Sequence, residues 1–196
     1  MSAHADPLVR LADDRRRARD ANDPWANLCV LGTVDRDGRA QTRVLVLRDI
    51  DERLGIFVNA TSPKCAELER GADAAVLVYL ASLGIQYRLR TTLSPIDAEI
   101  VSASWQQRPR IPQVMDWLYT RRAPQSTRLD SRDALTGLFS AVDAELGPTP
   151  VAPATALGFY LDVTQLERLQ LAGDRVHDRV EYTRTPNGWQ AHVLIP

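Results

Sequence analysis

The feature that most constrains the fold is a succession of short segments with strand character, rich in valine, leucine and isoleucine and bounded by turn residues. Segments of this length and composition are typical of β-strands. Turn chemistry at residues 35–38 and 49–53 connects the first three segments and predicts an antiparallel meander. We predict about nine strands, at residues 28–34, 41–48, 55–59, 74–80, 85–93, 156–163 and 166–171 and in a C-terminal hairpin turning at 185–188. So many short strands favour a closed sheet, hence a mainly β (α+β) barrel.

Helices are predicted around this barrel. Ser62–Pro63 and Ser94–Pro95 each pair a capping serine with a proline suited to a first helical turn. Asp6–Pro7 begins a further helix, in which the arginines at 15–17 are balanced by neighbouring aspartates and are interpreted as a solvated face. The predicted helices cover residues 62–70, 94–107, 112–120 and 131–146, besides the one that begins at residue 7.

Composition excludes several classes of protein. The chain has 196 residues and a formal net charge of -1, which suits one compact domain and gives no bulk attraction to nucleic acid or to an anionic membrane. No apolar stretch approaches the roughly 20 residues that span a bilayer, and the N-terminus lacks a signal-peptide layout. Cys29 and Cys65 have no disulfide or metal spacing and are interpreted as buried thiols. We therefore expect a cytoplasmic protein without a metal site.

Near the C-terminus, the segment Arg175-Val-His-Asp-Arg179 places two arginines and a histidine at alternate positions. An extended backbone would direct all three side chains to one face, where they would suit an anion. The alternative is a solvated strand whose arginines form salt bridges.

Three other positions have similar potential. Arg43 heads the apolar run Val44 to Leu47, and its planar fork suits a phosphate, although it can equally be a strand-end residue in water. Lys64 lies in the first turn of a predicted helix, where a cation is unfavourable unless an anion lies beside it. Gln125 and Ser126 carry hydrogen-bonding groups for an oxyanion.

Taken in order, these residues resemble those of the pyridoxine/pyridoxamine 5'-phosphate oxidase family of flavoproteins. The stretches that carry the resemblance are 33–38, 43–48, 108–110 and 175–179, followed by Tyr182, Arg184 and Gly188–Trp189, and the resemblance extends over residues 27–196. It implies a split β-barrel homodimer that binds FMN at the subunit interface. It also implies a division into a lead-in helix at 1–26, an FMN-binding core at 27–147, and C-terminal strands at 148–196 that complete the barrel and the dimer and substrate region.

The resemblance further implies individual contacts, while no catalytic residue is assigned. The implied flavin contacts are Arg43, Val44, Leu45, Val46, Leu47, Phe57, Val58, Lys64, Gln86, Gln125, Ser126 and Arg179. The implied substrate contacts are Arg48 and Arg108 on its phosphate and Arg175 and His177 over the ring.

The sequence departs from the family pattern at both ends of the implied site. Pro63 replaces an arginine at the FMN phosphate, and Leu169 replaces a tryptophan beside the flavin. At the substrate phosphate, Ser104 stands in place of a tyrosine, Pro112 in place of a serine, and Arg48 in place of a lysine. The leading hypothesis is an FMN-dependent oxidoreductase that takes hydride from an amine or alcohol. The alternatives are a flavin enzyme, such as a flavin reductase, with a different small-molecule substrate, and a flavin-binding module without turnover.

Overall fold

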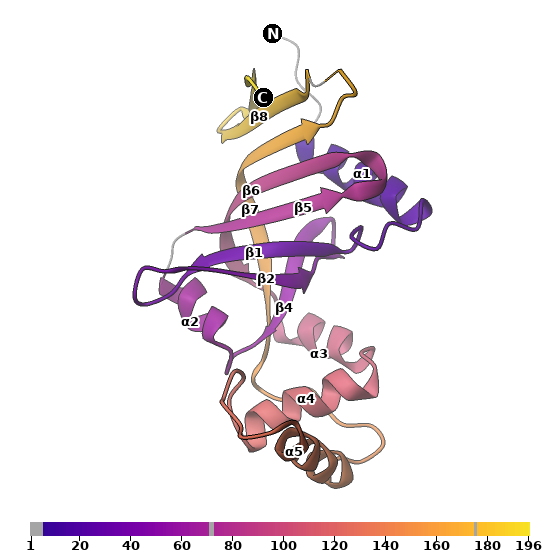
Figure 1. Cartoon of the computed structure of the whole chain (residues 1–196), viewed down its shortest axis with the longest axis vertical. Coiled ribbons are helices and arrows are strands. Elements are labelled where there is room, and N and C mark those ends of the chain that lie inside the picture. The colour runs from indigo at the N-terminus through magenta and orange to yellow at the C-terminus, as the bar shows by residue number, and fades with distance from the viewer. Residues whose placement is uncertain (1–5, 71–72, 175) are drawn as a thin grey trace.

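The computed structural model describes residues 6–70, 73–174 and 176–196. Within these ranges the chain forms one antiparallel nine-stranded sheet, five α-helices and a short 3-10 helix at Ala81–Leu83. The helices are α1 (Pro7–Asp20), α2 (Pro63–Arg70), α3 (Ala98–Gln106), α4 (Arg110–Arg121) and α5 (Arg132–Glu145). The strands are β1 (Leu28–Val34), β2 (Ala40–Val46), β3 (Arg48–Ile50), β4 (Arg53–Asn59), β5 (Ala74–Leu80), β6 (Ile85–Pro95), β7 (Ala156–Gln170), β8 (Asp178–Thr185) and β9 (Gly188–Val193). Figure 1 shows α3, α4 and α5 at one end of the molecule, and β8 with the C-terminus at the other.

The sheet curls because a single residue joins its two ends. In the strand order β2-β1-β5-β6-β7-β4-β3, β2 and β3 are farthest apart, yet only Leu47 separates them in the chain. The Leu47 side chain is buried, and its backbone N–H donates to the carbonyl oxygen of Asn27 at 2.9 Å. The sheet therefore folds back on itself as a half-barrel, and the predicted antiparallel split barrel with peripheral helices is confirmed.

The longest strand, β7, joins two segments that we predicted as separate strands. Its first half pairs with β4 and its second half pairs with β8, while β6 follows it along the other side. The register shifts between Arg90 and Thr91, which leaves Thr164 as an extra residue in β7. A bulge of this kind bends the strand without ending it, so the two predicted segments form one strand.

The predicted start of the helix at Ser94–Pro95 is wrong. Both residues pair with β7 at the end of β6, and α3 begins at Ala98 after Asp97. A proline is tolerated at the last position of a strand as well as in a first helical turn, so its sequence signal is ambiguous. The equivalent prediction at Ser62–Pro63 is confirmed, since Pro63 is the first residue of α2.

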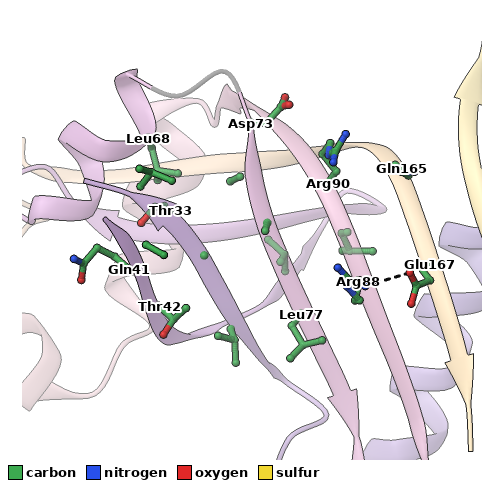
Figure 2. Close-up of a pocket in the computed structure, with 18 of the residues that line it drawn as sticks. Thr33, Gln41, Thr42, Leu68, Asp73, Leu77, Arg88, Arg90, Gln165 and Glu167 are labelled. Carbon is green, nitrogen blue, oxygen red and sulfur yellow. Dashed lines mark hydrogen bonds and ion pairs between the residues drawn. The ribbon is translucent and has the colours of Figure 1, made fainter. Parts of the chain in front are cut away.

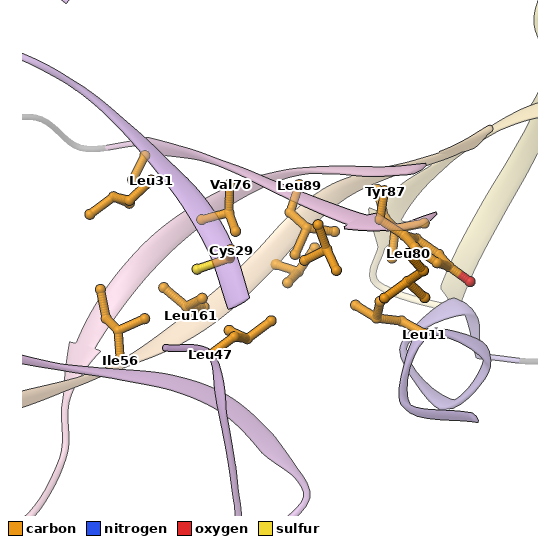
Figure 3. Close-up of a cluster of buried hydrophobic side chains, with 14 of the residues drawn as sticks. Leu11, Cys29, Leu31, Leu47, Ile56, Val76, Leu80, Tyr87, Leu89 and Leu161 are labelled. Atoms are coloured by element: carbon orange, nitrogen blue, oxygen red, sulfur yellow. The ribbon is translucent and has the colours of Figure 1, made fainter. Parts of the chain in front are cut away.

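The main hydrophobic core lies between the curled sheet and α1. Figure 3 shows Leu11 of α1 close to Leu80 and Tyr87 at one end of the cluster, with Ile56 and Leu47 toward the other. These side chains leave water almost completely, which is the dominant favourable contribution to folding.

The interpretation of the arginine run on α1 as a solvated face is wrong for Arg15, which is fully buried. Its guanidinium donates to the carbonyl oxygens of Ala26 at 3.1 Å and Leu47 at 2.9 Å, and it pairs with Asp49. The neighbouring Asp14 is also buried and accepts from the Tyr87 hydroxyl at 2.7 Å. These partners are distant in sequence, so the local balance of charges did not reveal them.

Both cysteines are free and buried, as predicted. Burial raises the pKa of the Cys29 thiol to about 11, which keeps it protonated at neutral pH. In the part of the chain that the structure describes, no helix is both long enough and apolar enough to cross a bilayer.

Candidate functional site

Arg43 lies in β2 opposite Leu31, on the face of the sheet that carries the core, and reaches helix α2. Its guanidinium donates to Oε2 of Glu67 at 2.8 Å and to the hydroxyl of Thr33, and that hydroxyl donates to the same oxygen at 2.6 Å. The Glu67 side chain is 6% exposed. The charge of Arg43 is thus balanced by a buried carboxylate of its own chain.

Lys64 lies beside this pair and is only partly balanced. Its ammonium donates to Oε1 of Gln125 at 3.3 Å, and among the described residues no carboxylate lies within ion-pair distance of it. Burial lowers the pKa of Lys64, and the positive charge of Arg43 acts in the same direction. We call Arg43, Lys64, Glu67 and Gln125 the α2 cluster. Its two cations and one carboxylate leave a net positive charge next to a side-chain amide, which suits a phosphate.

The loop that carries Gln125 and Ser126 is anchored to the segment before α2. The backbone N–H of Gln125 donates to the Thr61 hydroxyl at 3.2 Å, and that hydroxyl donates to Asn59 at 2.8 Å. Ser126 is exposed and has φ of 73°, in the left-handed region. The structure therefore brings Arg43, Lys64 and Gln125 together, with Ser126 next in the chain.

The remaining predicted flavin contacts of β2 and β4 alternate between solvent and core. Val44 and Val46 are exposed on the outer face, whereas Leu45 is half-buried and Leu47 is buried. Val58 packs against the main core. The ring of Phe57 lies over Gly158, where an added Cβ would be 2.9 Å from two ring atoms.

A second group of predicted contacts forms a row across three strands. Gln86 in β6 lies opposite Leu169 in β7, which lies opposite Arg179 in β8. Gln86 stands between the buried Ile85 and Tyr87, so it faces away from the core. Since β1 and β5 lie between β2 and β6, roughly 14 Å of sheet separates this row from Arg43.

Arg179 is also paired within the chain. Its guanidinium donates to both carboxylate oxygens of Glu167 at 3.0 Å, and Arg88 donates to the same carboxylate at 3.4 Å. The hydrogen bond with Glu167 and the charge of that carboxylate raise the pKa of Arg179.

A groove of about 1170 Å³ extends along the sheet between the two groups. Figure 2 shows Thr33, Gln41 and Leu68 at one side and the Arg88–Glu167 pair at the other. Val34, Val44, Val46 and Tyr79 are exposed on the same outer face of the sheet. Several exposed apolar side chains on one face of a sheet suit an interaction surface.

Arg108 lies in the turn before α4, and its guanidinium is paired with Asp116. The same carboxylate accepts from the Trp105 indole N–H at 2.8 Å and from the Asn59 amide at 3.3 Å. The Asp116 side chain is 8% exposed. We call Asn59, Trp105, Arg108 and Asp116 the α4 cluster. Burial raises the pKa of the neighbouring Tyr119, and the charge of Asp116 acts in the same direction.

The other predicted substrate residues are more dispersed. Arg48 is exposed at the start of β3 and forms no ion pair among the described residues. Ser104 and Pro112 are half-buried on α3 and α4.

The predicted strand does not include His177, because β8 begins at Asp178. Nδ1 of His177 accepts from the backbone N–H of Ala172 at 3.1 Å, which ties the ring to the preceding turn. Arg175 lies outside the described residues.

Sequence reasoning missed Glu67, Asn59 and Asp116, which connect the predicted residues. Glu67 follows Lys64 by three positions, a spacing that places both on one side of a helix. Asp116 interrupts an apolar stretch of α4 between Met115 and Trp117, and a carboxylate at such a position requires hydrogen-bond partners. Asn59 carries no comparable signal.

Comparison with known proteins identifies the class and then the family. In fold, the chain resembles the crystal structure of PhzG from Burkholderia lata in complex with tetrahydrophenazine-1-carboxylic acid, with a TM-score of 0.87, 26% identity, and coverage of 100% of this chain and 95% of that chain. A pyridoxamine 5'-phosphate oxidase-related, FMN-binding protein from Nostoc punctiforme has a TM-score of 0.76 at 22% identity, and the match covers 100% of both chains. The fold is thus a split barrel of this class.

Sequence comparison gives the family. The family model described as pyridoxamine 5'-phosphate oxidase matches residues 24–144. A pyridoxine/pyridoxamine 5'-phosphate oxidase from Pseudomonas putida is 32% identical over 173 residues, 87% of this chain and 79% of the relative. One from Burkholderia mallei is 30% identical over 194 residues, 97% of this chain and 89% of the relative. The chain belongs to the pyridoxamine 5'-phosphate oxidase family.

Proposed function

We propose that this protein is an FMN-dependent oxidoreductase that takes hydride from an amine or alcohol carbon of a small-molecule substrate. The α2 cluster carries the proposal: a half-buried lysine, which has no carboxylate within ion-pair distance among residues 6–70, 73–174 and 176–196, lies beside an arginine and a side-chain amide. This set of donors fits a phosphate monoester such as that of FMN. Bound FMN would supply the redox chemistry, with oxygen as the final acceptor and peroxide as a product.

The side chains of the protein would bind FMN and orient the flavin. Lys64, Arg43 and Gln125 would bind the phosphate, and Ser126 would add a hydroxyl. Phe57, held over Gly158, would border the flavin from β4. No side chain is required as a nucleophile, because bound FMN would itself supply the acceptor for the hydride.

The proposed active form is a homodimer with FMN at its interface. Support comes from the two separate groups of predicted contacts, one near α2 and one in the row containing Gln86 and Arg179, and from the exposed apolar side chains beside the groove. In a symmetric dimer, the α2 cluster of one copy and the row of the other would face one flavin.

Titration of flavin-free protein with FMN tests the cofactor assignment. We expect micromolar binding, followed by flavin fluorescence, and loss of at least about 100-fold in affinity for the Arg43→Ala, Lys64→Ala double variant, because two charge-assisted contacts are removed. The matched control is Arg36→Ala, Arg39→Ala, which removes two exposed arginines of the β1–β2 turn. Equal affinities in the two double variants would contradict the phosphate assignment.

A complementation experiment tests the dimer. The Arg43→Ala, Lys64→Ala variant is mixed with a Gln86→Ala, Arg179→Ala variant after both are dissociated and refolded together. If one flavin needs residues from both copies, each variant alone loses FMN and each mixed dimer recovers one intact site. Absence of recovery in mixed dimers, with dimer mass verified by light scattering, would refute the shared site.

A second candidate is a flavin enzyme whose substrate carries no phosphate. Ser104 and Pro112 stand where the family has hydrogen-bonding groups for the substrate phosphate, and the ligand bound by PhzG is a carboxylic acid. Peroxide formation with pyridoxamine 5'-phosphate and FMN-loaded protein separates the two candidates. Absence of turnover with every amine, alcohol or cyclic acid tried would instead favour a flavin-binding module.

A further inference from the structure

Asp116 is a buried carboxylate held by three segments of the chain. Asn59 at the end of β4, Trp105 in α3 and Arg108 before α4 all donate to it. A buried charge is tolerated only when such partners satisfy it, so the carboxylate and the guanidinium form a unit. Helix α4 holds this unit in place by packing Val114 and Leu118 into its own small core with α5.

The pairing determines what Arg108 can bind. A guanidinium binds a phosphate well when its planar fork and its charge are both available. Here the charge of Arg108 is neutralised by Asp116, and a phosphate dianion brought to the exposed part of Arg108 would also approach that carboxylate. The energy of two like charges at short separation opposes this approach.

The next arginine offers no replacement. Arg110 donates to the Asp143 carboxylate at 2.8 Å and to the carbonyl oxygens of Asp143, Leu146 and Gly147 at the end of α5. It therefore acts as a cap for α5 and a brace between α4 and α5. Arg108 and Arg110 thus both form ion pairs with carboxylates of the same chain.

The α4 cluster lies next to predicted flavin contacts. Asn59 follows Phe57 and Val58 in the chain, and its Oδ1 accepts from Thr61, which in turn accepts from the backbone of Gln125. A continuous set of hydrogen bonds thus connects Asp116 to the loop of the α2 cluster. The carboxylate is positioned at the border of the proposed active site.

We propose that Asp116 is a specificity-determining residue, which withholds Arg108 from anionic ligands so that this end of the substrate site receives a group without a phosphate. The inference rests on the proposed function, because it concerns the substrate of the same site. It places the substrate among compounds that carry no phosphate group at this end.

The test compares two ligands that differ only in a phosphate, pyridoxine 5'-phosphate and pyridoxine. Binding to wild-type protein and to Asp116→Asn is measured by calorimetry, with FMN bound and again without FMN. The wild type should bind the two ligands within about threefold of each other. Asparagine keeps the shape and can still accept from Trp105 while removing the charge, so the variant should bind the phosphate ester at least about tenfold more tightly. Affinity for pyridoxine should not change.

Two results would overturn the proposal: a wild type that already prefers the phosphate ester by tenfold or more, or a folded Asp116→Asn protein with an unchanged preference. A failure of FMN binding in the wild type would instead refute the proposed cofactor, and the flavin-free titration would still decide the role of Asp116. If Asp116→Asn does not fold, Arg108→Gln gives the answer. It should leave the ratio of the two affinities unchanged, and a selective loss of phosphate-ester binding would contradict the inference.

Discussion

The α2 cluster and the α4 cluster are built from the same parts but have different charge. Each contains an arginine paired with a carboxylate that is less than one-tenth exposed, Arg43 with Glu67 and Arg108 with Asp116. The α2 cluster has in addition Lys64, whose partner is an amide and not a carboxylate. One cluster is thus left positive and the other is neutral.

An arginine at a position where the family resemblance implies a phosphate contact is therefore not by itself an anion site. What matters is the charge that remains after the chain has satisfied its own groups, because a cluster whose charges cancel attracts a phosphate less than one that is left positive. By that criterion the α2 cluster can bind a phosphate, whereas the α4 cluster is part of the framework.

The largest expected effect follows from breaking the α4 cluster. Asp116→Ala leaves Arg108 without its counter-ion and Trp105 without an acceptor, so we expect a loss of about 3 kcal/mol in the free energy of unfolding. Urea unfolding followed by circular dichroism measures it. The control is Asp143→Ala in α5, which removes a carboxylate that is 43% exposed. This carboxylate pairs with Arg110 of α4, the helix that also carries Asp116. That change should cost at most about 1 kcal/mol. Equal losses would mean that the α4 cluster contributes no more to the free energy of unfolding than an exposed ion pair.

A smaller effect follows from making the α2 cluster more positive. Glu67→Gln removes the charge that balances Arg43 while keeping an acceptor for Thr33, so FMN should bind about fivefold more tightly. The free energy of unfolding should fall by about 1 kcal/mol, because a charge-assisted hydrogen bond becomes a neutral one. Flavin fluorescence and urea unfolding measure the two quantities. Glu69→Gln changes the same helix at an exposed position and should alter neither; an unchanged affinity in Glu67→Gln would show that Glu67 does not oppose the phosphate.

The smallest effect is a dependence of FMN binding on pH. Burial and the nearby Arg43 lower the pKa of Lys64, so in the free protein it loses its proton at a lower pH than an exposed lysine. A bound phosphate favours the charged form, so FMN affinity should be highest below this lowered pKa and fall as the pH rises through it, by at most about threefold. Titrations between neutral and alkaline pH measure the slope. Lys64→Met should abolish it, and a slope that persists in this variant would have to come from another group.

Much of the fold could be predicted from local patterns. The bounds of β1 and β5 agree with the predicted segments, the turn at Gly38 has the positive φ that glycine favours, and Ser131 caps α5 through the backbone N–H of Ala134. These features depend on neighbouring residues. The errors arise where a local signal has two meanings, as for Ser94–Pro95 at a strand end and for Thr164 in a bulge.

For the site, the resemblance to the family supplied positions, and three of them, Arg43, Lys64 and Gln125, lie together in the structure. The sequence by itself determined the strand and turn pattern and the supply of cationic side chains, because both follow from residue type and order. Which of these cations are neutralised by a carboxylate depends on the tertiary structure alone. Asp116 is 57 residues from Asn59 in the sequence, and Glu67 is 24 residues from Arg43, with β3 and β4 between them. Side-chain charges pair across space without regard to that separation.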